Sequence, residues 1–393
     1  MRAPGDRPPR SANRAWRRPR HVAAIAALCL SAMVAARSRA QEIAFPGVGA
    51  RGVFDASLEA EPRSHRIWMS YSAVEPETVG GSTIDTVSTR LALSQDRGAT
   101  WTDRGAVLNQ AQIEAQPPAQ LSGRPAVWQH EVSRLFYDRG APSAERWKLL
   151  WHRYLLADDG NAQTDDRQFQ HGWIGLRIAA TPEALVTAPR RKLFAAAGYD
   201  LDAAYNDAVI GPPEIRLGTI DPALAQCVAV SEPGAAATAR GLYVSLVCVG
   251  TTPSVQRIVM LYWPYPAGPW QYLGSTLDTA MAAALDPSFI GFSAPELVAH
   301  GSRVMLIATP TVAPFGFYGG CMGFRFAARD SAALRDRDRD GRPDVQFRIA
   351  ADPGGFAGAC GFAIESRRSG VVLSRAQLTE PIRYHLVATG VRP

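Results

Sequence analysis

Hydrophobic and polar residues alternate over many short stretches of the chain, and this alternation predicts β-strands. Between residues 85 and 93, β-branched or apolar residues alternate with polar ones, and a second strand-like run follows over residues 102–108. Further segments of strong β character lie at residues 242–249 and 257–263. The best helix candidate is the short segment 276–285. Gly and Pro separate the strand-like segments at intervals typical of an all-β protein.

The octet at residues 94–101 lies between the first two of these runs and should form the tip of a hairpin. Asp96 can accept hydrogen bonds from the backbone of the turn, and Gly98 can adopt the positive φ that a tight loop needs. Trp101 can place a large ring in the layer below. Hydroxyl groups that can make contacts across the tip come from Ser94 and Thr100.

This octet has the form Ser-x-Asp-x-Gly-x-Thr-Trp and resembles the Asp-box of sialidases and related bacterial-neuraminidase-repeat proteins. The resemblance implies a β-propeller fold. In that family the box is a structural hairpin at the rim of a blade, remote from the catalytic centre, so the motif bears on architecture more than on activity. An ordinary hairpin that happens to spell the motif is the alternative interpretation.

A recurring segment predicts how the chain divides into blades. Residues 211–215 and 293–297 share the form small-x-Pro-Glu-aliphatic, and residues 122–127 are a looser relative. Each is followed by segments of β character. Repeats that each supply several strands are typical of propeller blades.

Five approximate blades then cover the chain, and its final strand, residues 382–389, could close the ring with an N-terminal strand. The fold prediction is an all-β propeller, similar to five-bladed propeller glycosidases, with a six-bladed sialidase-like count and a two-sheet β-sandwich as alternatives. The Ala-rich residues 235–239 follow a Pro-Gly pair and are predicted to be a loop. The predicted blades span residues 54–108, 124–194, 214–277, 296–349 and 360 onward.

Three acidic residues lie at predicted strand starts: Asp55, Glu214 and Glu296. Equivalent strand starts of a propeller converge at the central channel, so acids far apart in sequence would become neighbours. Cleavage of a glycoside requires two carboxyl groups with different pKa values, one as general acid and one as base or nucleophile. The three acids are therefore the candidate catalytic residues. The alternative is that a Glu after Pro accepts hydrogen bonds of a turn or faces solvent.

The resemblance to sialidases implies an arginine trio that binds the substrate carboxylate and a tyrosine nucleophile. By position, Arg124 and Tyr384 are candidates for substrate binding. The early Arg-Ile-Pro motif of that family has only a weak counterpart at residues 51–54, which favours a divergent propeller over a true sialidase. The predicted function is an action on extracellular carbohydrate, with exo-sialidase-like glycoside hydrolysis as the candidate reaction. The alternative is a non-catalytic propeller that binds a glycan or a protein.

Residues 1–40 are predicted to be a secretory signal, and residues 41–393 a single propeller domain. An Arg-rich start precedes an apolar run of about 15 residues, which is short beside the roughly 20 that a membrane-spanning helix needs. Small residues for cleavage occur at residues 38–40. We therefore expect a secreted or periplasmic protein without an integral membrane domain after cleavage. An uncleaved N-terminal anchor is the alternative.

The net charge of +6 comes from the N-terminal segment. Residues 1–40 hold nine Arg and one acid, so the remaining chain is slightly negative. Arg and Asp are interspersed there rather than grouped by sign, which excludes a nucleic-acid-binding stripe. We expect a monomer whose partner is a carbohydrate or glycoconjugate.

Four Cys residues follow the predicted signal, and an even number in an exported chain suggests disulfides with three possible pairings. The segments 227–231 and 243–248 look like two arms of one hairpin. This favours a bond between Cys227 and Cys248 and leaves Cys321 to pair with Cys360. Four free buried thiols are the alternative.

The segment 336–344 carries Asp at its positions 1, 3, 5 and 9 and Gly at position 6. It resembles the calcium loops of EF-hand-like and thrombospondin-type repeats, and oxygen ligands on one side of a tight loop suit Ca²⁺. Phe347 occupies the position of the bidentate Glu of an EF-hand. A solvated, self-paired charge run is the alternative. The predicted ligands of a structural Ca²⁺ are Asp336, Asp338, Asp340 and Asp344.

Overall fold

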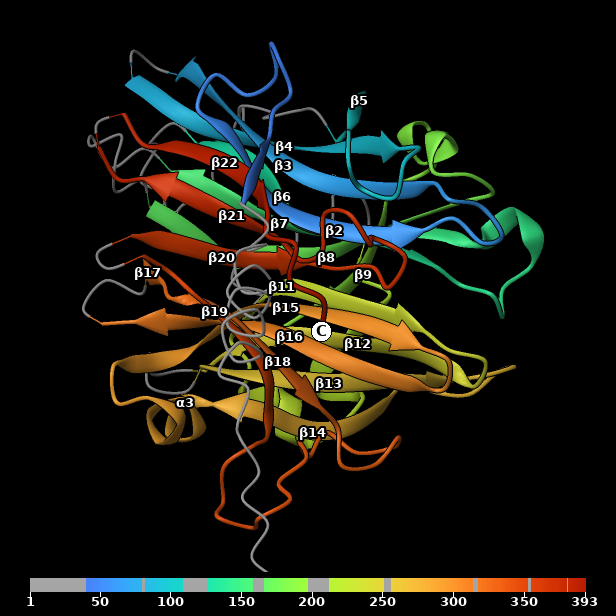
Figure 1. Cartoon of the computed structure of the whole chain (residues 1–393). Helices are drawn as coiled ribbons and strands as arrows, with labels where there is room; N and C mark the ends of the chain where they lie inside the picture. The colour runs from blue at the N-terminus through green and yellow to red at the C-terminus, as the bar shows by residue number, and fades with distance from the viewer. Residues whose placement is uncertain are drawn as a thin grey trace, which may run out of the picture. The chain divides into compact units, whose positions relative to one another are not determined.

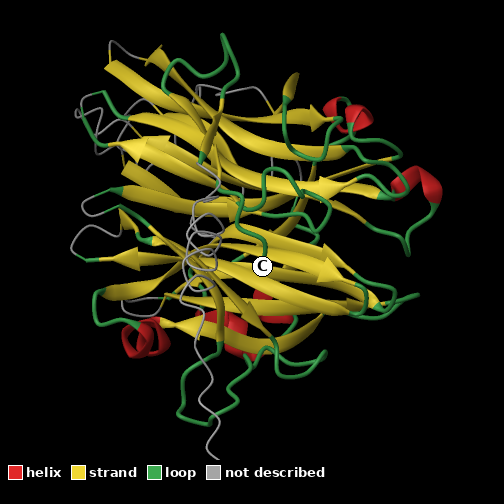
Figure 2. Cartoon of the chain, viewed as in Figure 1, coloured by secondary structure: helices red, strands yellow, loops and turns green. Residues whose placement is uncertain are grey.

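A computed structural model describes residues 40–79, 82–108, 126–157, 166–196, 212–250, 256–313, 317–352, 355–379 and 381–393. Residues 1–39 of the predicted signal and Arg124 lie outside these ranges. The regular structure within them is almost entirely β-strand, with short helical turns between strands (Figure 2). No helix in the described ranges is long and apolar enough to cross a membrane.

The strands follow one another in five groups along the chain (Figure 1). The first group is β2 (Gly52–Ala60), β3 (Ile67–Val79), β4 (Ser82–Ser94) and β5 (Thr102–Leu108). The second is β6 (Ala126–Tyr137), β7 (Trp147–Ala157), β8 (Asp166–Ala179), β9 (Arg191–Ala195) and β10 (Ile215–Arg216). The third is β11 (Ala229–Ala237), β12 (Gly241–Val249), β13 (Gln256–Pro264) and β14 (Gln271–Asp278).

The last two groups hold the C-terminal third of the chain and the first strand. The fourth group is β15 (Phe289–His300), β16 (Arg303–Val312), β17 (Phe317–Tyr318), β18 (Gly320–Arg325) and β19 (Val345–Ala350). The fifth is β20 (Phe356–Gly361), β21 (Val372–Gln377), β22 (Arg383–Ala388) and β1 (Gln41–Ile43). The helical elements are α3 (Thr279–Leu285) and 3₁₀ turns at Ser143–Glu145, Glu183–Val186, Leu217–Thr219 and Pro222–Gln226.

The two ends of the described chain meet in the fifth group. Strand β1 pairs antiparallel with β22, with Gln41 opposite Ala388. A single parallel pair, Gly52 with Tyr384, also joins β2 to β22, so the first and fifth groups form one continuous sheet. The prediction that the final strand meets an N-terminal strand is confirmed.

One strand of each group faces a common centre, and we call β2, β6, β11, β15 and β20 the inner strands. Each contacts the next inner strand in chain order, and β20 contacts β2, so the ring is closed. We call the region that they enclose the hub. This arrangement is a β-propeller, to which the described residues contribute the five inner strands named above. A two-sheet sandwich is excluded because a sandwich contains no such ring.

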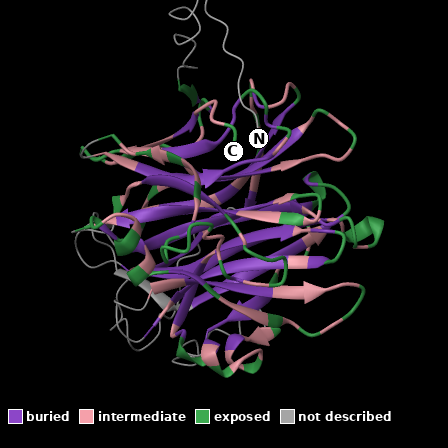
Figure 3. Cartoon of the chain, turned by 60° about the horizontal axis from the view of Figure 1, so that its bottom comes forward, coloured by how far each residue is buried: buried purple, intermediate pink, exposed green. Residues whose placement is uncertain are grey.

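Five apolar clusters fill the spaces between neighbouring groups. The buried residues run along the strands, whereas exposed residues gather in the connections (Figure 3). Burial of apolar area between sheets is the main term that stabilises such a fold. Representative buried members, in order around the ring, are Trp68 with Leu149, Phe194 with Leu246, Tyr243 with Leu306, Ile307 with Leu373, and Tyr71 with Leu386.

Every inner strand carries the same irregularity near its middle. One residue adopts a positive φ, and at that point the pairing with the next strand shifts register, which is a β-bulge. A bulge bends its strand and redirects side chains, here toward the hub. The residues with positive φ are Asp55 (54°), Val132 (47°), Glu232 (49°), Ala294 (44°) and Ala359 (49°).

At two of these bulges the backbone N–H group donates to a hydroxyl group of a neighbouring strand. The N–H of Asp55 donates to Ser374 Oγ of β21 at 2.8 Å, and that of Ala359 donates to Thr309 Oγ1 of β16 at 2.8 Å. Thr309 belongs to the fourth group and Ser374 to the fifth, so each bond links two successive groups. An unpaired buried N–H would cost free energy, so these bonds stabilise the bulges.

The structure corrects two predictions about chain segments. The third blade begins at β11 and not at Glu214, because residues 215–216 form β10 at the outer edge of the second sheet, parallel to β9. Residues 235–237, predicted to be a loop, belong to β11. Small side chains suit this strand because Ala235 and Ala236 are buried between neighbouring sheets. The predicted helix at 276–285 is present as α3, which Asp278 caps by accepting from the N–H of Met281.

Both predicted disulfide pairings are present. Cys227 bonds to Cys248 with a Cα–Cα distance of 5.2 Å, joining the start of β11 to its hairpin partner β12. Cys321 on β18 bonds to Cys360 on β20 with a Cα–Cα distance of 6.3 Å. The second bond therefore links the fourth group to the fifth.

The octet at residues 94–101 forms the tip between β4 and β5. Asp96 Oδ1 accepts from the N–H groups of Ala99 at 3.0 Å and Thr100 at 2.9 Å, and its Oδ2 accepts from Thr100 Oγ1 at 2.8 Å. Ser94 Oγ accepts from the N–H of Gly98, whose φ is +90°. Trp101 packs against the cluster between the first and fifth groups. The octet is thus a structural hairpin, and its kinship with sialidases stays a prediction.

Replacement of Asp96 by Ala should lower the free energy of unfolding by about 1 to 3 kcal/mol, because several hydrogen bonds of the turn are lost together. Burial alone would raise the pKa of Asp96, but the bonds from Thr100, Ser94 and Ala99 outweigh it and lower the pKa. The stabilisation is therefore present above the ordinary pKa of an aspartate and is lost as the pH falls through the lowered value. Urea unfolding at pH 7 measures the effect. Replacement of the exposed Gln95 by Ala is the control, and an equal loss there would contradict the assignment.

Candidate active site at the hub

Three carboxyl groups approach one another from three successive inner strands. Asp55 and Glu232 are themselves bulge residues of β2 and β11, and Glu131 directly precedes the bulge residue of β6. The three groups are close enough for their charges to interact, because the charges of Glu131 and Glu232 both raise the pKa of the Asp55 carboxyl. Closure of the ring thus places together acids that lie far apart in the sequence.

Asp55 is the most deeply buried of these acids, with 1% of its surface exposed. Burial raises the pKa of its carboxyl well above the usual value, and the charges of Glu131 and Glu232 raise it further. Arg134 and the hydroxyl of Ser72, which donates to Oδ2 at 3.4 Å, oppose the shift without cancelling it. Asp55 therefore keeps its proton to higher pH than an ordinary aspartate and can act as a proton donor.

Glu232 is held as a hydrogen-bond acceptor. Its Oε2 accepts from the backbone N–H of Ala294 at 2.6 Å, and its Oε1 accepts from the hydroxyl of Tyr318 at 3.1 Å. Burial and the nearby charges of Glu232, Asp55 and Glu131 raise the pKa of Tyr318 well above the usual value. The phenol therefore stays protonated and donates to Glu232, which fixes the orientation of this carboxylate.

Glu296 lies beside the bulge in the middle of β15 and not at a strand start as predicted, and it belongs to a buried ion pair. Nε of Arg134, a residue 1% exposed, lies 2.8 Å from Oε2 of Glu296 and also donates to the carbonyl of Pro295 at 3.1 Å. Ser57 Oγ donates to Oε1 at 3.3 Å. Burial raises the pKa of Glu296 to about 7, although Arg134 and Ser57 lower it. We assign Glu296 to positioning of Arg134.

Glu214, predicted to be catalytic, lies elsewhere. It precedes β10 at the outer edge of the second sheet. There its two carboxylate oxygens accept hydrogen bonds from Nε and one terminal nitrogen of Arg191, each at 2.6 Å. Both side chains are well exposed to solvent. The structure does not bring Glu214 together with Asp55 and Glu296, because the Pro-Glu-Ile segment it belongs to continues the second sheet and does not begin an inner strand.

Four partly buried aromatic rings form a continuous arc beside the three carboxyl groups. The ring of Phe54, adjacent to Asp55, stacks on that of Tyr384 at 4.9 Å. Tyr384 meets Phe356 edge-on at 6.4 Å, and Phe356 stacks on Tyr318 at 4.7 Å. The arc therefore runs from the neighbour of Asp55 to the partner of Glu232. Of the two residues predicted to bind substrate, Tyr384 lies in this arc.

Sequence reasoning missed Glu131, Glu232 and Tyr318. A signal for Glu232 exists, since residues 231–233 and 293–295 share the form Ser-x-Pro and occupy equivalent bulges. The prediction relied on the Pro-Glu pattern, which aligns Glu296 with Glu214. Glu214 lies next to the outer strand β10 and not on an inner strand. Nothing comparable in the sequence marks Glu131 or Tyr318, because their roles depend on the ring.

The predicted calcium loop forms a compact exposed turn. Carboxylate oxygens of Asp336, Asp338 and Asp340 lie within 4.8 Å of one another, a spacing that suits one cation. The two oxygens of Asp336 already accept from the N–H groups of Arg339 at 2.7 Å and Gly341 at 3.0 Å. The fourth predicted ligand, Asp344, pairs with Arg337, whose Nε lies 3.3 Å from Oδ2. Calcium binding stays a prediction.

No known family model and no curated protein matches the chain. Similar solved structures include a thermostable family-43 glycoside hydrolase, with TM-score 0.47, 10% identity and coverage of 87% of this chain and 91% of that one. A family-117 glycoside hydrolase from Zobellia galactanivorans has TM-score 0.46, 9% identity and 89% coverage of both chains. A β-fructofuranosidase from Bombyx mori has TM-score 0.44, 9% identity and coverage of 94% of this chain and 67% of that one.

Glu59, further along β2, provides a test of the electrostatics of the hub. Burial raises its pKa to about 8, and the charges of Glu365 and Glu296 add to the shift. The folded state therefore binds a proton that the unfolded state releases between about pH 4.5 and 8, and the free energy of unfolding falls as the pH rises through this window. Replacement of Glu59 by Gln should remove this fall and stabilise the protein at pH 8.5, by on the order of 2 kcal/mol, with little effect at pH 4.5.

Chemical unfolding at both pH values measures this difference. Replacement of the exposed Glu42 by Gln serves as the control and should change both values equally. A Glu59→Gln variant that follows the pH dependence of the unmodified chain would contradict the raised pKa.

Calcium binding at residues 336–344 can be measured by titration calorimetry on the chelator-treated chain. Uptake of one Ca²⁺ is expected, and replacement of Asp338 by Asn should abolish it, because the change removes one of the three clustered carboxylates. Absence of heat with the unmodified chain would show that the loop is a self-paired charge run.

Proposed function

We propose that this chain is a glycoside hydrolase whose active site lies at the hub. The observation that carries the proposal is the buried carboxyl of Asp55, flanked by the carboxylates of Glu131 and Glu232 from the next two inner strands. Two carboxyl groups with different proton affinities are the requirement for glycoside cleavage by acid and base or nucleophile. The two disulfides agree with the oxidising compartment that the predicted signal implies.

In the proposed mechanism Asp55 donates its proton to the glycosidic oxygen as the bond to the leaving group breaks. Glu232, held by Tyr318 and the N–H of Ala294, acts as the second carboxyl group. It either activates a water molecule or attacks the sugar carbon directly, depending on its separation from Asp55 in the complex. Glu131 raises the pKa of Asp55 and so keeps the donor protonated.

The aromatic arc supports a sugar as the substrate. The rings of Phe54, Phe356 and Tyr384 are only partly buried, and such rings offer apolar faces against which a sugar ring can pack. The arginine that acts on Asp55 is Arg134, and it is already engaged by Glu296. This favours a glycosyl unit without a carboxylate over exo-sialidase-like cleavage, which would need free arginines.

A non-catalytic carbohydrate-binding propeller is the second candidate. It is favoured by the low exposure of Asp55, 1%, since a substrate must reach this carboxyl before a proton can be transferred. In that case the three acids would form a structural cluster beneath the aromatic arc.

The two candidates are separated by activity on a panel of neutral aryl glycosides and polysaccharides. With the substrate that the unmodified chain cleaves, Asp55→Asn and Glu232→Gln should each lower kcat/KM by about 10²- to 10⁴-fold. The activity of the unmodified chain should fall as the pH rises through the raised pKa of Asp55, because the proton donor is then lost. Glu214→Gln is the matched control, since this carboxylate lies at the outer edge of its sheet.

Full activity of both hub variants would overturn the catalytic assignment. Binding of neutral oligosaccharides without release of reducing ends, and with loss of binding in a Tyr384→Ala variant, would instead establish the carbohydrate-binding module.

A further inference from the structure

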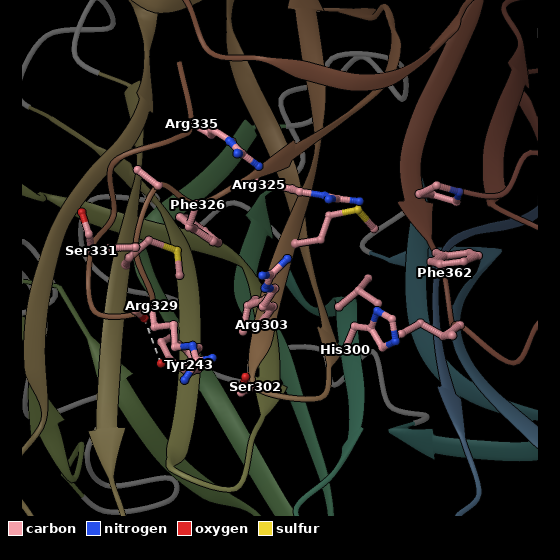
Figure 4. A pocket seen from close by; sticks show the side chains of 18 residues that line it. Tyr243, His300, Ser302, Arg303, Arg325, Phe326, Arg329, Ser331, Arg335 and Phe362 are labelled. Atoms are coloured by element: carbon pink, nitrogen blue, oxygen red, sulfur yellow. Dashed lines mark hydrogen bonds between the residues drawn. The ribbon is translucent and has the colours of Figure 1, made fainter. Parts of the chain in front are cut away.

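A cavity of about 570 Å³ lies at the far ends of three strands in the fourth group, beside parts of the third and fifth (Figure 4). Its lining includes the hairpin from His300 to Arg303, where β15 turns into β16. The bulge of β15 at Ala294 lies near the middle of that strand, six residues before His300, so the cavity lies at the C-terminal end of β15 and its lining contains none of the hub acids. The inference drawn from it does not depend on the proposed hydrolysis.

Four arginines line this cavity. Figure 4 shows side chains of Arg303, Arg325 and Arg335 directed into the same hollow, with Arg329 beside Tyr243. His300, the register partner of Arg303 in the hairpin between β15 and β16, lies beside it (Figure 4). The cavity therefore collects cationic groups from separate strands and from the segment that follows β18.

The strand register fixes three of these arginines on one face. Arg325 of β18 is directly opposite Met305 of β16, and Arg303 precedes Met305 by two residues, so both arginines lie on the same side of the sheet. The N–H of Arg335 donates to the carbonyl of Arg325 at 2.8 Å, and an antiparallel bridge joins the adjacent residues Phe326 and Leu334. Arg335 is thereby placed opposite Arg325.

The residues around the cavity balance only a small part of its positive charge. Among the described residues that line the cavity there is no Asp or Glu side chain, and the carboxylate in the lining is the α-carboxylate of Pro393. None of the four arginines pairs with a carboxylate of the described chain. The acidic side chain in the vicinity is Asp330, whose charge acts on Tyr243 together with that of Arg329. Like charges fixed opposite each other on neighbouring strands are unfavourable, and an anion between them would reverse the sign of that interaction.

The remaining lining is apolar and aromatic. Phe326 and Phe362 lie on opposite sides of the cavity, and Met260, Met305 and Val298 complete its apolar surface. A volume of this size is within the range that accommodates a small organic ligand. An apolar surface with arginines on one side suits a ligand that has a ring-sized body and one oxyanion group.

We propose that this cavity binds an acidic saccharide unit, that is, a sugar carrying a sulfate, carboxylate or phosphate group. The oxyanion lies between Arg303, Arg325 and Arg335, whose guanidinium groups donate charge-assisted hydrogen bonds to two or more of its oxygens. The sugar ring packs against Phe362, which belongs to the same apolar cluster as Met305 and so lies on the face of the sheet that carries Arg303 and Arg325. Sulfate, carboxylate and phosphate groups all present an oxyanion to the arginines, and the experiment distinguishes sugars that carry each of them.

Titration calorimetry with the full chain at low salt tests the proposal. The probes are a sulfated heparin disaccharide, digalacturonate, glucose 6-phosphate, inorganic sulfate and neutral cellobiose. We expect one charged sugar to bind more tightly than inorganic sulfate, with affinity that falls as NaCl is added. The double variant Arg303→Gln/Arg325→Gln should weaken this binding at least about tenfold, because two charge-assisted contacts are lost. Arg104→Gln, an exposed arginine of β5, is the matched control and should bind normally.

Three outcomes would overturn the proposal: failure of every charged sugar to bind, unchanged binding in the double variant, or equal affinity for inorganic sulfate and the best charged sugar. Both substituted arginines are exposed, so the double variant should fold, and circular dichroism together with Tm verifies this. A Phe362→Leu variant provides a second test, since it should weaken binding of the charged sugar but leave binding of inorganic sulfate unaffected.

Discussion

Closure of the ring of inner strands is the constraint on which the rest of the structure depends. Each of the five inner strands contacts two others, so their side chains meet in a confined region. A bulge with one residue of positive φ recurs in all five strands, although none of these five residues is Gly or Asn. Such backbone is costly for residues with a side chain, and its fivefold repetition indicates that the surrounding contacts compensate for it.

The same confinement explains the electrostatics of the hub. A carboxyl group that leaves water becomes harder to ionise, and a second carboxylate nearby strengthens the effect. Asp55 experiences both, whereas Glu296 has a buried guanidinium beside it, which opposes the rise of its pKa. Chemically similar side chains thus acquire different proton affinities from their places on the ring. Carboxyl groups with different pKa values can serve as acid and base, and here the difference arises from their places on the ring, not from an unusual residue type.

Local patterns in the sequence were sufficient for the fold class, the hairpin at residues 94–101 and the cysteine pairing. These features depend on residues that are close in sequence or have few alternative partners, such as the two hairpin arms around Cys227 and Cys248. The candidate site was only partly accessible. Asp55 was identified from its position at a strand start, but Glu131 and Glu232 were not, because their equivalence is one of bulge position in three dimensions. The Pro-Glu pattern selected Glu214, which shares the local spelling but lies on an outer strand.

The pairing of β1 with β22 has a consequence for the behaviour of the chain in solution. In the fifth group β22 has β21 on one side, and along its other side residues 41–43 occupy backbone groups that would otherwise be unpaired. An open strand edge is a template for association with a strand from another molecule. Residues 41–43 therefore occupy part of the edge of β22 and hinder its pairing with a strand of a second molecule.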